Sequence, residues 1–160
     1  MKQDRFLIGI LIGIVGIVVI SLGLFFLRKN SENYVAEDAP ENIVHNYVVA
    51  IHKGDFEKAY SYLSDSQSKP SYEVFRKAFI TNMVTPKNVG LEIGSADIRS
   101  DNASVSLNTI YNASDPFSSG YRNNDVALLI KQDGQWKLEQ MPYNFWAYDW
   151  YQPTPMPYKP

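Results

Sequence analysis

Residues 125–140, DVALLIKQDGQWKLEQ, form the segment that decides the fold. Apolar residues flank an Asp-Gly dipeptide at 133–134, which predicts a β-hairpin. A two-residue turn there would pair Lys131 with Trp136. A bulged turn would instead pair Ile130 with Trp136. Because a shift of one residue moves every side chain to the other face, the hydrophobic pattern favours the bulged register.

Two more strands are expected upstream of this hairpin. Apolar and small residues alternate from Val89, and the alternation shifts at Gly94, which predicts a bulge or bend there. After a turn at 101–102, one set of alternating positions forms the expected inner face of the next strand: Ala103, Val105, Leu107, Thr109 and Tyr111. The sequence therefore predicts a curved antiparallel sheet of about four strands.

Three helices are predicted before the sheet. In residues 41–53 the apolar positions recur with helical spacing at Ile43, Val44, Tyr47, Val48 and Ile51. Gly54 is the expected left-handed cap, and Asp55 the N-cap of a second helix. Ser71 is expected to cap a third, over residues 71–83, with Val74, Phe75, Ala78, Phe79 and Met83 facing the core.

Residues 6–27, FLIGILIGIVGIVVISLGLFFL, carry no charge. As a helix they would measure about 33 Å, against a bilayer core of about 30 Å. This predicts a single-pass transmembrane anchor over 1–29 with the lipid bilayer as its partner, in preference to a cleaved signal peptide. Two basic residues lie on each side, so the charge rule barely orients it. We expect a cell-membrane location with the C-terminal domain outside the cytoplasm.

Composition excludes several functions. The chain has 15 basic and 17 acidic residues and no cysteine, so we expect neither nucleic-acid binding nor thiolate chemistry. His45 and His52 are predicted to lie opposite the apolar face of their helix and too far apart to share a metal ion. We therefore expect no metal site and no cofactor.

The helix pair joined at Gly54-Asp55 (NYVVAIHKGDFEKAYSYLS) and the Gly134-x-Trp136 hairpin resemble the nuclear transport factor 2-like superfamily. Within it, the chain is similar to small membrane-anchored bacterial proteins. The resemblance covers about residues 38–142 and implies a cystatin-like cone, in which the sheet curls around a pocket that helices close. Such cones include ketosteroid isomerases, polyketide cyclases and non-enzymatic binding domains.

With this resemblance, the expected organisation is an anchor (1–29), a linker (30–40), an α+β domain (41–142) and a tail (143–160). Inward positions make a candidate pocket lining of Tyr47, Tyr60, Phe79, Asp97, Tyr111 and Trp136. Asp97 is its one acidic member. The parity shift at Gly94 leaves the direction of Asp97 open, and a solvent-facing side chain is the favoured alternative.

The C-terminal residues 141–160 contain seven aromatic residues and five prolines. Such rings are costly to leave in water, so they are expected to bury against the domain, a partner protein or a membrane interface, with self-packing favoured. The candidate interface residues are Phe145, Trp146, Trp150 and Tyr151. The leading hypothesis is a non-enzymatic module that binds a protein or ligand, with a membrane or cell-envelope protein as one partner. The alternative is a pocket enzyme or a carrier of a hydrophobic ligand.

Overall fold

The computed structural model describes residues 3–29, 33–87, 89–111 and 120–151, with the side chains of the first helix described from position 8 to position 24. The chain divides into two compact units, residues 1–33 and residues 34–160. Each unit is described by itself below.

The first unit contains helix α1 (Gln3–Lys29), whose described apolar side chains are exposed. Within the part of the chain that the structure describes, no helix combines the length and the apolar character needed to cross a bilayer. The predicted fold class is corrected on this point: α1 is a helix of the fold, and its assignment as a transmembrane element is wrong.

The second unit begins with three helices, α2 (Pro40–Lys53), α3 (Phe56–Ser61) and α4 (Tyr72–Ile80). Their predicted caps are confirmed. Gly54 ends α2 with a φ of 73°, and the carboxylate of Asp55 accepts a hydrogen bond from the backbone N–H of Lys58. The hydroxyl of Ser71 accepts one from Val74 in the same way. Glycine is required after α2 because a side chain would strain this left-handed backbone.

The predicted core positions of α2 are all buried. In the predicted helix 71–83, the prediction that Val74 and Met83 face the core is wrong. Val74 and Met83 are 49% and 66% exposed. Helix α4 ends at Ile80, and Asn82 has a left-handed φ of 57°, so the helical periodicity does not continue as far as Met83. Val84 is buried instead.

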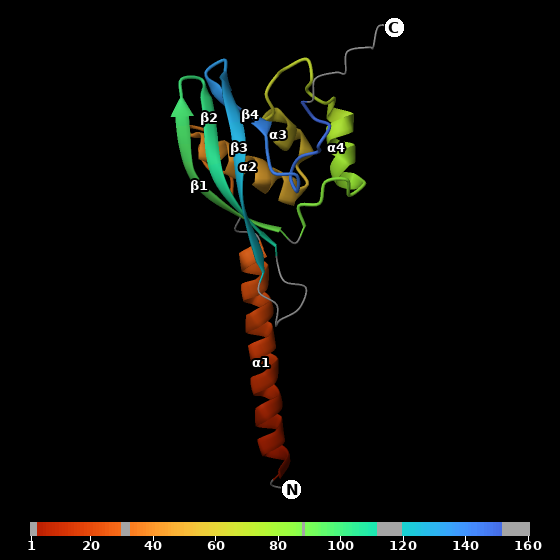
Figure 1. Cartoon of the computed structure of the whole chain (residues 1–160). Coiled ribbons are helices and arrows are strands. Elements are labelled where there is room, and N and C mark those ends of the chain that lie inside the picture. The colour runs from red at the N-terminus through yellow and green to blue at the C-terminus, as the bar shows by residue number, and fades with distance from the viewer. Residues whose placement is uncertain (1–2, 30–32, 88, 112–119, 152–160) are drawn as a thin grey trace, which may run out of the picture. The chain divides into compact units, whose positions relative to one another are not determined.

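The sheet contains β1 (Val89–Arg99), β2 (Asn102–Tyr111), β3 (Tyr121–Gln132) and β4 (Gln135–Gln140), in that order and antiparallel. In Figure 1 its strands curve past α2, with α3 and α4 to one side. The predicted irregularity in β1 is confirmed between Ile93 and Ala96. A Cβ on Gly94 would lie 3.0 Å from the carbonyl oxygen of Ser106, so the two backbones approach closely there. The predicted inner face of β2 is also confirmed, with its first four positions buried and Tyr111 half-buried.

The predicted hairpin register is wrong. Lys131 pairs with Trp136, and the turn is the two-residue one, with φ of 51° at Asp133 and 80° at Gly134. Positive φ at both positions is typical of the turn whose twist matches that of two paired strands. Lys131 makes a cation–π contact with its partner in this register, because its ammonium lies 5.6 Å from the centre of the Trp136 ring.

This register decides which side chains of β3 face inward. Ala127 and Leu129 are buried, whereas Val126 and Leu128 are 47% and 40% exposed. The bulge lies farther along the hairpin, between Leu128 and Leu129. Asp125 has the same parity as Ala127 and therefore faces the inner side of the sheet.

After β4, residues 141–151 form the C-terminal segment, which folds back into the core. Phe145, Trp146 and Trp150 are at most 5% exposed. The hydroxyl of Tyr47 on α2 donates a 2.7 Å hydrogen bond to the carbonyl oxygen of Phe145. For these three rings the structure shows burial against the domain itself, the first of the destinations considered. Residues 152–160 lie outside the described part of the chain.

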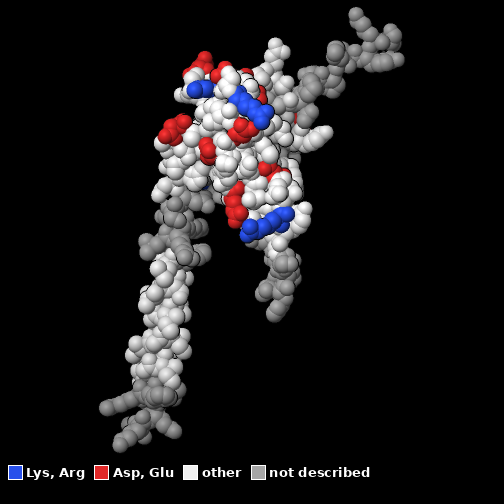
Figure 2. All heavy atoms as spheres, turned by 60° about the vertical axis from the view of Figure 1, so that its left-hand side comes forward, with Lys and Arg blue, Asp and Glu red and all other residues white. Residues whose placement is uncertain are grey.

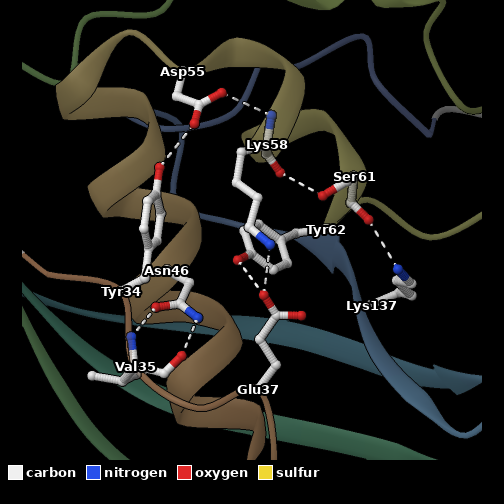
Figure 3. A network of polar contacts seen from close by, with 9 residues as sticks. All are labelled: Tyr34, Val35, Glu37, Asn46, Asp55, Lys58, Ser61, Tyr62 and Lys137. Atoms are coloured by element: carbon white, nitrogen blue, oxygen red, sulfur yellow. Dashed lines mark hydrogen bonds and ion pairs between the residues drawn. The ribbon is translucent and has the colours of Figure 1, made fainter.

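Residues 34–38, here called the N-terminal segment, are fastened to α2 and α3 by polar contacts (Figure 3). Asn46 is fully buried, and its amide exchanges hydrogen bonds of 2.8 and 2.9 Å with the backbone N–H and carbonyl of Val35. The carboxylate of Glu37 accepts hydrogen bonds from Lys58 at 2.7 Å and from Tyr62 at 2.8 Å. The contact with Lys58 is the largest cause holding the pKa of Glu37 below its ordinary value, and the same contact raises the pKa of Lys58.

Candidate functional site

The interior of the cone is filled by the protein's own aromatic side chains. Trp136 from β4 is 8% exposed and belongs to the same core cluster as the buried rings of the C-terminal segment. Trp146 lies 6.2 Å from Tyr47, and Trp150 lies 5.0 Å from Phe75, measured between ring centres. The space that would form a ligand chamber in an open cone is therefore occupied by residues from α2, α4 and the C-terminal segment.

A cluster of polar side chains lies on β2 and β3, at Thr109, Asn123 and Asp125. The hydroxyl of Thr109, on β2, donates a 2.6 Å hydrogen bond to the carboxylate of Asp125 on β3. The side-chain amide of Asn123 donates to the other carboxylate oxygen at 2.9 Å. Thr109 is fully buried and Asp125 is half-buried. The carboxylate is thus held in a fixed position by two donors, one on its own strand and one on β2.

A second polar chain joins the end of β2 to the C-terminal segment. The hydroxyl of Tyr111 lies 2.7 Å from that of Tyr143 and donates a 2.8 Å hydrogen bond to the side-chain oxygen of Asn144. Burial, and then the hydrogen bond with Tyr143, raise the pKa of Tyr111 well above its ordinary value. Through its hydrogen bond to Asn144, the hydroxyl of Tyr111 acts as a donor that positions the C-terminal segment.

Beside these clusters lies a cavity of about 550 Å³, here called the edge cleft. Its walls are residues 124–126 of β3, residues 139–140 of β4 and much of the C-terminal segment. Strand β4 pairs with β3 only as far as Leu128, whereas β3 extends back to Tyr121. Within the described residues no strand pairs with residues 121–127 of β3 on that side, so β3 presents an open edge to the cleft.

The lining of the edge cleft is acidic and aromatic. Asp125 and Glu139 contribute carboxylates, and none of the lining residues is basic. Tyr143 and Tyr148 are 67% and 89% exposed, and Trp146 lies deeper. On the molecular face seen in Figure 2, acidic and basic side chains are interspersed.

The six candidate pocket residues are placed in different surroundings. Tyr47 and Phe79 are core residues, and half-buried Tyr60 donates a 2.8 Å hydrogen bond to the carbonyl of Pro70. Asp97 is exposed and pairs with Arg99 at 2.8 Å. Trp136 closes the core beneath Lys131, and Tyr111 belongs to the chain described above.

The candidate interface residues lie close to one another. Trp146 contacts Trp150, with 5.2 Å between ring centres, and stacks on Tyr151 at 5.5 Å. The hydroxyl of half-buried Tyr151 donates to the carbonyl of Ser64. Burial is the first cause that raises the pKa of Tyr151, to about 12. Three of the four candidates, all but Phe145, also line the edge cleft.

Sequence reasoning missed nine of the twelve lining residues of the cleft, among them its two acidic residues, Asp125 and Glu139, and its two exposed tyrosines, Tyr143 and Tyr148. The signal for Asp125 was present in the sequence. The Asp-Gly dipeptide at 133–134 favours the two-residue turn, and counting back from that turn places Leu129, Ala127 and Asp125 on the inner face. The predicted bulged register instead placed Ile130, Leu128 and Val126 on the inner face, and so placed Asp125 on the outer one. Within the described residues, no group of three or more potential ligands is arranged to hold a metal ion.

No family model and no curated protein matches the chain. Solved structures that resemble it include a SEC-C motif containing protein from Rhodopseudomonas palustris, at 11% identity and a TM-score of 0.48, covering 66% of this chain and 79% of that one. A protein from Campylobacter jejuni named as an NTF2-like transpeptidase has 18% identity and a TM-score of 0.42, covering 62% and 95%. A cystatin fold protein from Novosphingobium aromaticivorans has 12% identity and a TM-score of 0.42, covering 64% and 98%.

Likenesses this distant say nothing about activity. The architecture of residues 34–151, with three helices followed by a curved four-stranded antiparallel sheet, is the one that the resemblance to the nuclear transport factor 2-like superfamily implies. At the level of the fold, the second unit therefore agrees with that resemblance.

Proposed function

We propose that the cone is a non-enzymatic binding module, which holds an extended segment of a partner protein in the edge cleft. The observation that carries the proposal is the position of this cleft beside the open edge of β3. An unpaired edge offers backbone N–H and C=O groups in a row, and an extended peptide can pair with them as an added strand. The cleft beside that edge can then receive side chains of the added strand.

The filled interior favours binding over catalysis. An enzyme of this fold needs an acid or base that faces a substrate inside the cone. Here Trp136, Phe145 and Trp150 are buried in the core, and the hydroxyl of Tyr111 is engaged by Asn144. Asp97, the acidic candidate from the sequence, pairs with Arg99 at the surface. An extended segment that binds at the edge needs none of these groups to react.

Fluorescence anisotropy with a library of short labelled peptides tests this proposal on the full chain. Mild detergent should be present, because α1 exposes apolar side chains. We expect a subset of peptides to bind the wild type and to lose affinity when Tyr143 and Tyr148 are both replaced by alanine. Met83→Ala is the matched control, because Met83 is also exposed and lies outside the cleft lining.

The same peptides with N-methyl groups on alternate amides distinguish strand pairing from non-specific hydrophobic binding. Methylation removes the N–H groups that an added strand needs, so the affinity should fall strongly for one of the two methylation patterns. Equal binding of both methylated forms would contradict strand addition at β3. A library in which no peptide binds would overturn the proposed function.

A further inference from the structure

We infer that the edge cleft selects a lysine or arginine side chain in the segment that it binds, by means of its carboxylates and its exposed tyrosine rings. This inference rests on the function proposed above and names the chemistry of the ligand. The first argument is charge. Asp125 and Glu139 both line the cleft, and no basic residue does. A cationic group entering the cleft would meet two carboxylates without displacing a cation of the protein.

The nearby basic residues of the sheet are engaged elsewhere. The guanidinium of Arg122 lies 3.6 Å from the carboxylate of Glu92 on β1. The ammonium of Lys137, on β4, donates a 2.9 Å hydrogen bond to the carbonyl of Ser61. The carboxylates of the cleft therefore keep their attraction for a cation supplied by a ligand.

The second argument is the aromatic lining. Ring faces attract ammonium and guanidinium groups, and the attraction grows when water is excluded. The protein makes such contacts elsewhere, with Lys69 at 4.5 Å from the ring centre of Tyr60 and Lys53 at 4.7 Å from that of Tyr34. Tyr143 and Tyr148, which are 67% and 89% exposed, line the same cleft as Asp125 and Glu139.

The third argument is an unpaired donor. Trp150 lines the cleft and is 3% exposed, and its indole N–H has no acceptor among the described residues. A buried donor without a partner is costly, and a partner entering from outside removes that cost. A peptide offers a carbonyl acceptor every residue, whereas a simple amine offers none. The combination of a carbonyl for Trp150 and a cation for the carboxylates therefore points to a peptide that contains a basic residue.

Matched peptides test the inference, starting from the best peptide of the library. The residue that enters the cleft is varied among lysine, arginine, norleucine and glutamate, and binding to the full chain is measured by anisotropy. We expect lysine and arginine to bind roughly 2- to 30-fold more tightly than norleucine, which has a similar length and no charge. Glutamate should bind most weakly, and the preference for lysine should shrink as salt is raised.

Glu139→Gln separates charge from shape. It should weaken the lysine peptide several-fold and leave the norleucine peptide unchanged. Glu73→Gln makes the same change on α4, away from the cleft lining, and should alter neither. If Glu139→Gln lowers the affinity for both peptides equally, the carboxylate of Glu139 does not distinguish a charged from an uncharged side chain, and the inference fails.

Two further results distinguish the inference from the proposed function. Norleucine that binds as tightly as lysine would overturn the basic preference while peptide binding stands. N-acetyl-lysine methylamide that binds as tightly as the whole peptide would overturn the extended-segment function and indicate a small amine as ligand. In ¹⁵N spectra, the indole N–H of Trp150, assigned with Trp150→Phe, should move downfield when the lysine peptide binds. An unmoved signal would contradict the role given to that donor.

Discussion

The N-terminal and C-terminal segments are both hydrogen-bonded to neighbouring residues of α2, but they differ in the further contacts that they make. Asn46 holds Val35 through two hydrogen bonds, and Tyr47, the next residue along the helix, holds the carbonyl of Phe145. The N-terminal segment adds a surface ion pair between Glu37 and Lys58, whereas the C-terminal segment adds three buried aromatic rings. Buried apolar area supplies most of the stabilisation in a fold, and hydrogen bonds supply direction. The C-terminal segment should therefore belong to the folding core, and the N-terminal segment should be positioned by it.

The largest expected effect comes from Phe145→Ala. Removing a fully buried ring costs about 3–5 kcal/mol of unfolding free energy. Urea unfolding followed by tryptophan fluorescence measures it, because all three tryptophans lie in the second unit. Tyr148→Ala removes an aromatic ring that is 89% exposed in the same segment, and its effect should stay within about 0.5 kcal/mol. Similar losses for both variants would mean that the segment is not part of the core.

This difference also explains what the sequence could predict. The aromatic residues of the C-terminal segment signalled burial by their composition alone, and α2 signalled its inward face by helical spacing. The polar fastening gave no such signal. Asn46 is buried because the N-terminal segment covers it, and no periodicity in the sequence shows that two distant segments will meet.

The edge cleft was hidden for a related reason. Its carboxylate Asp125 depends on the hairpin register, and in 125–140 both registers bury some of the consecutive apolar residues. The hydrophobic pattern favoured the bulged register, which is wrong, whereas the backbone preference of the Asp-Gly turn favours the two-residue register that the structure shows. The open edge of β3 depends on the unequal lengths of β3 and β4, which follow from where the C-terminal segment turns into the core.

A second prediction concerns the N-terminal segment. Asn46→Ala leaves the backbone N–H and carbonyl of Val35 without their partners and should cost about 1–3 kcal/mol. The measurement is the same urea titration, together with the rate at which a protease cleaves residues 34–38. Asn42→Ala is the comparison, because Asn42 on the same helix also bonds the N-terminal segment, at Asp38, but through an exposed hydrogen bond that should contribute less. If the two variants cleave at the same rate, Asn46 does not fasten the segment.

The smallest expected effect is that of Glu37→Gln, and pH distinguishes it. Exposed ion pairs contribute about 0.2–1 kcal/mol, and both partners here are more than a third exposed. Because the contact with Lys58 lowers the pKa of folded Glu37, its stabilisation is complete above the ordinary glutamate pKa of about 4.3 and is lost as pH falls through the lowered value. The raised pKa of Lys58 gives the opposite limit, with stabilisation lost as pH rises above the ordinary lysine range.

Wild type and Glu37→Gln should therefore differ most between these two limits and converge in acid. The comparison is made by urea titrations at a series of pH values. Glu57→Gln removes a charge at an exposed position of α3 beside Lys58, so it reports the general effect of charge without the hydrogen bond. If Glu57→Gln shows the same acid convergence, the effect belongs to net charge rather than to the Glu37–Lys58 contact. The Glu37–Lys58 contact would then contribute no more than any charge of the surface, and the buried bonds of Asn46 would be the stronger polar fastening of the N-terminal segment.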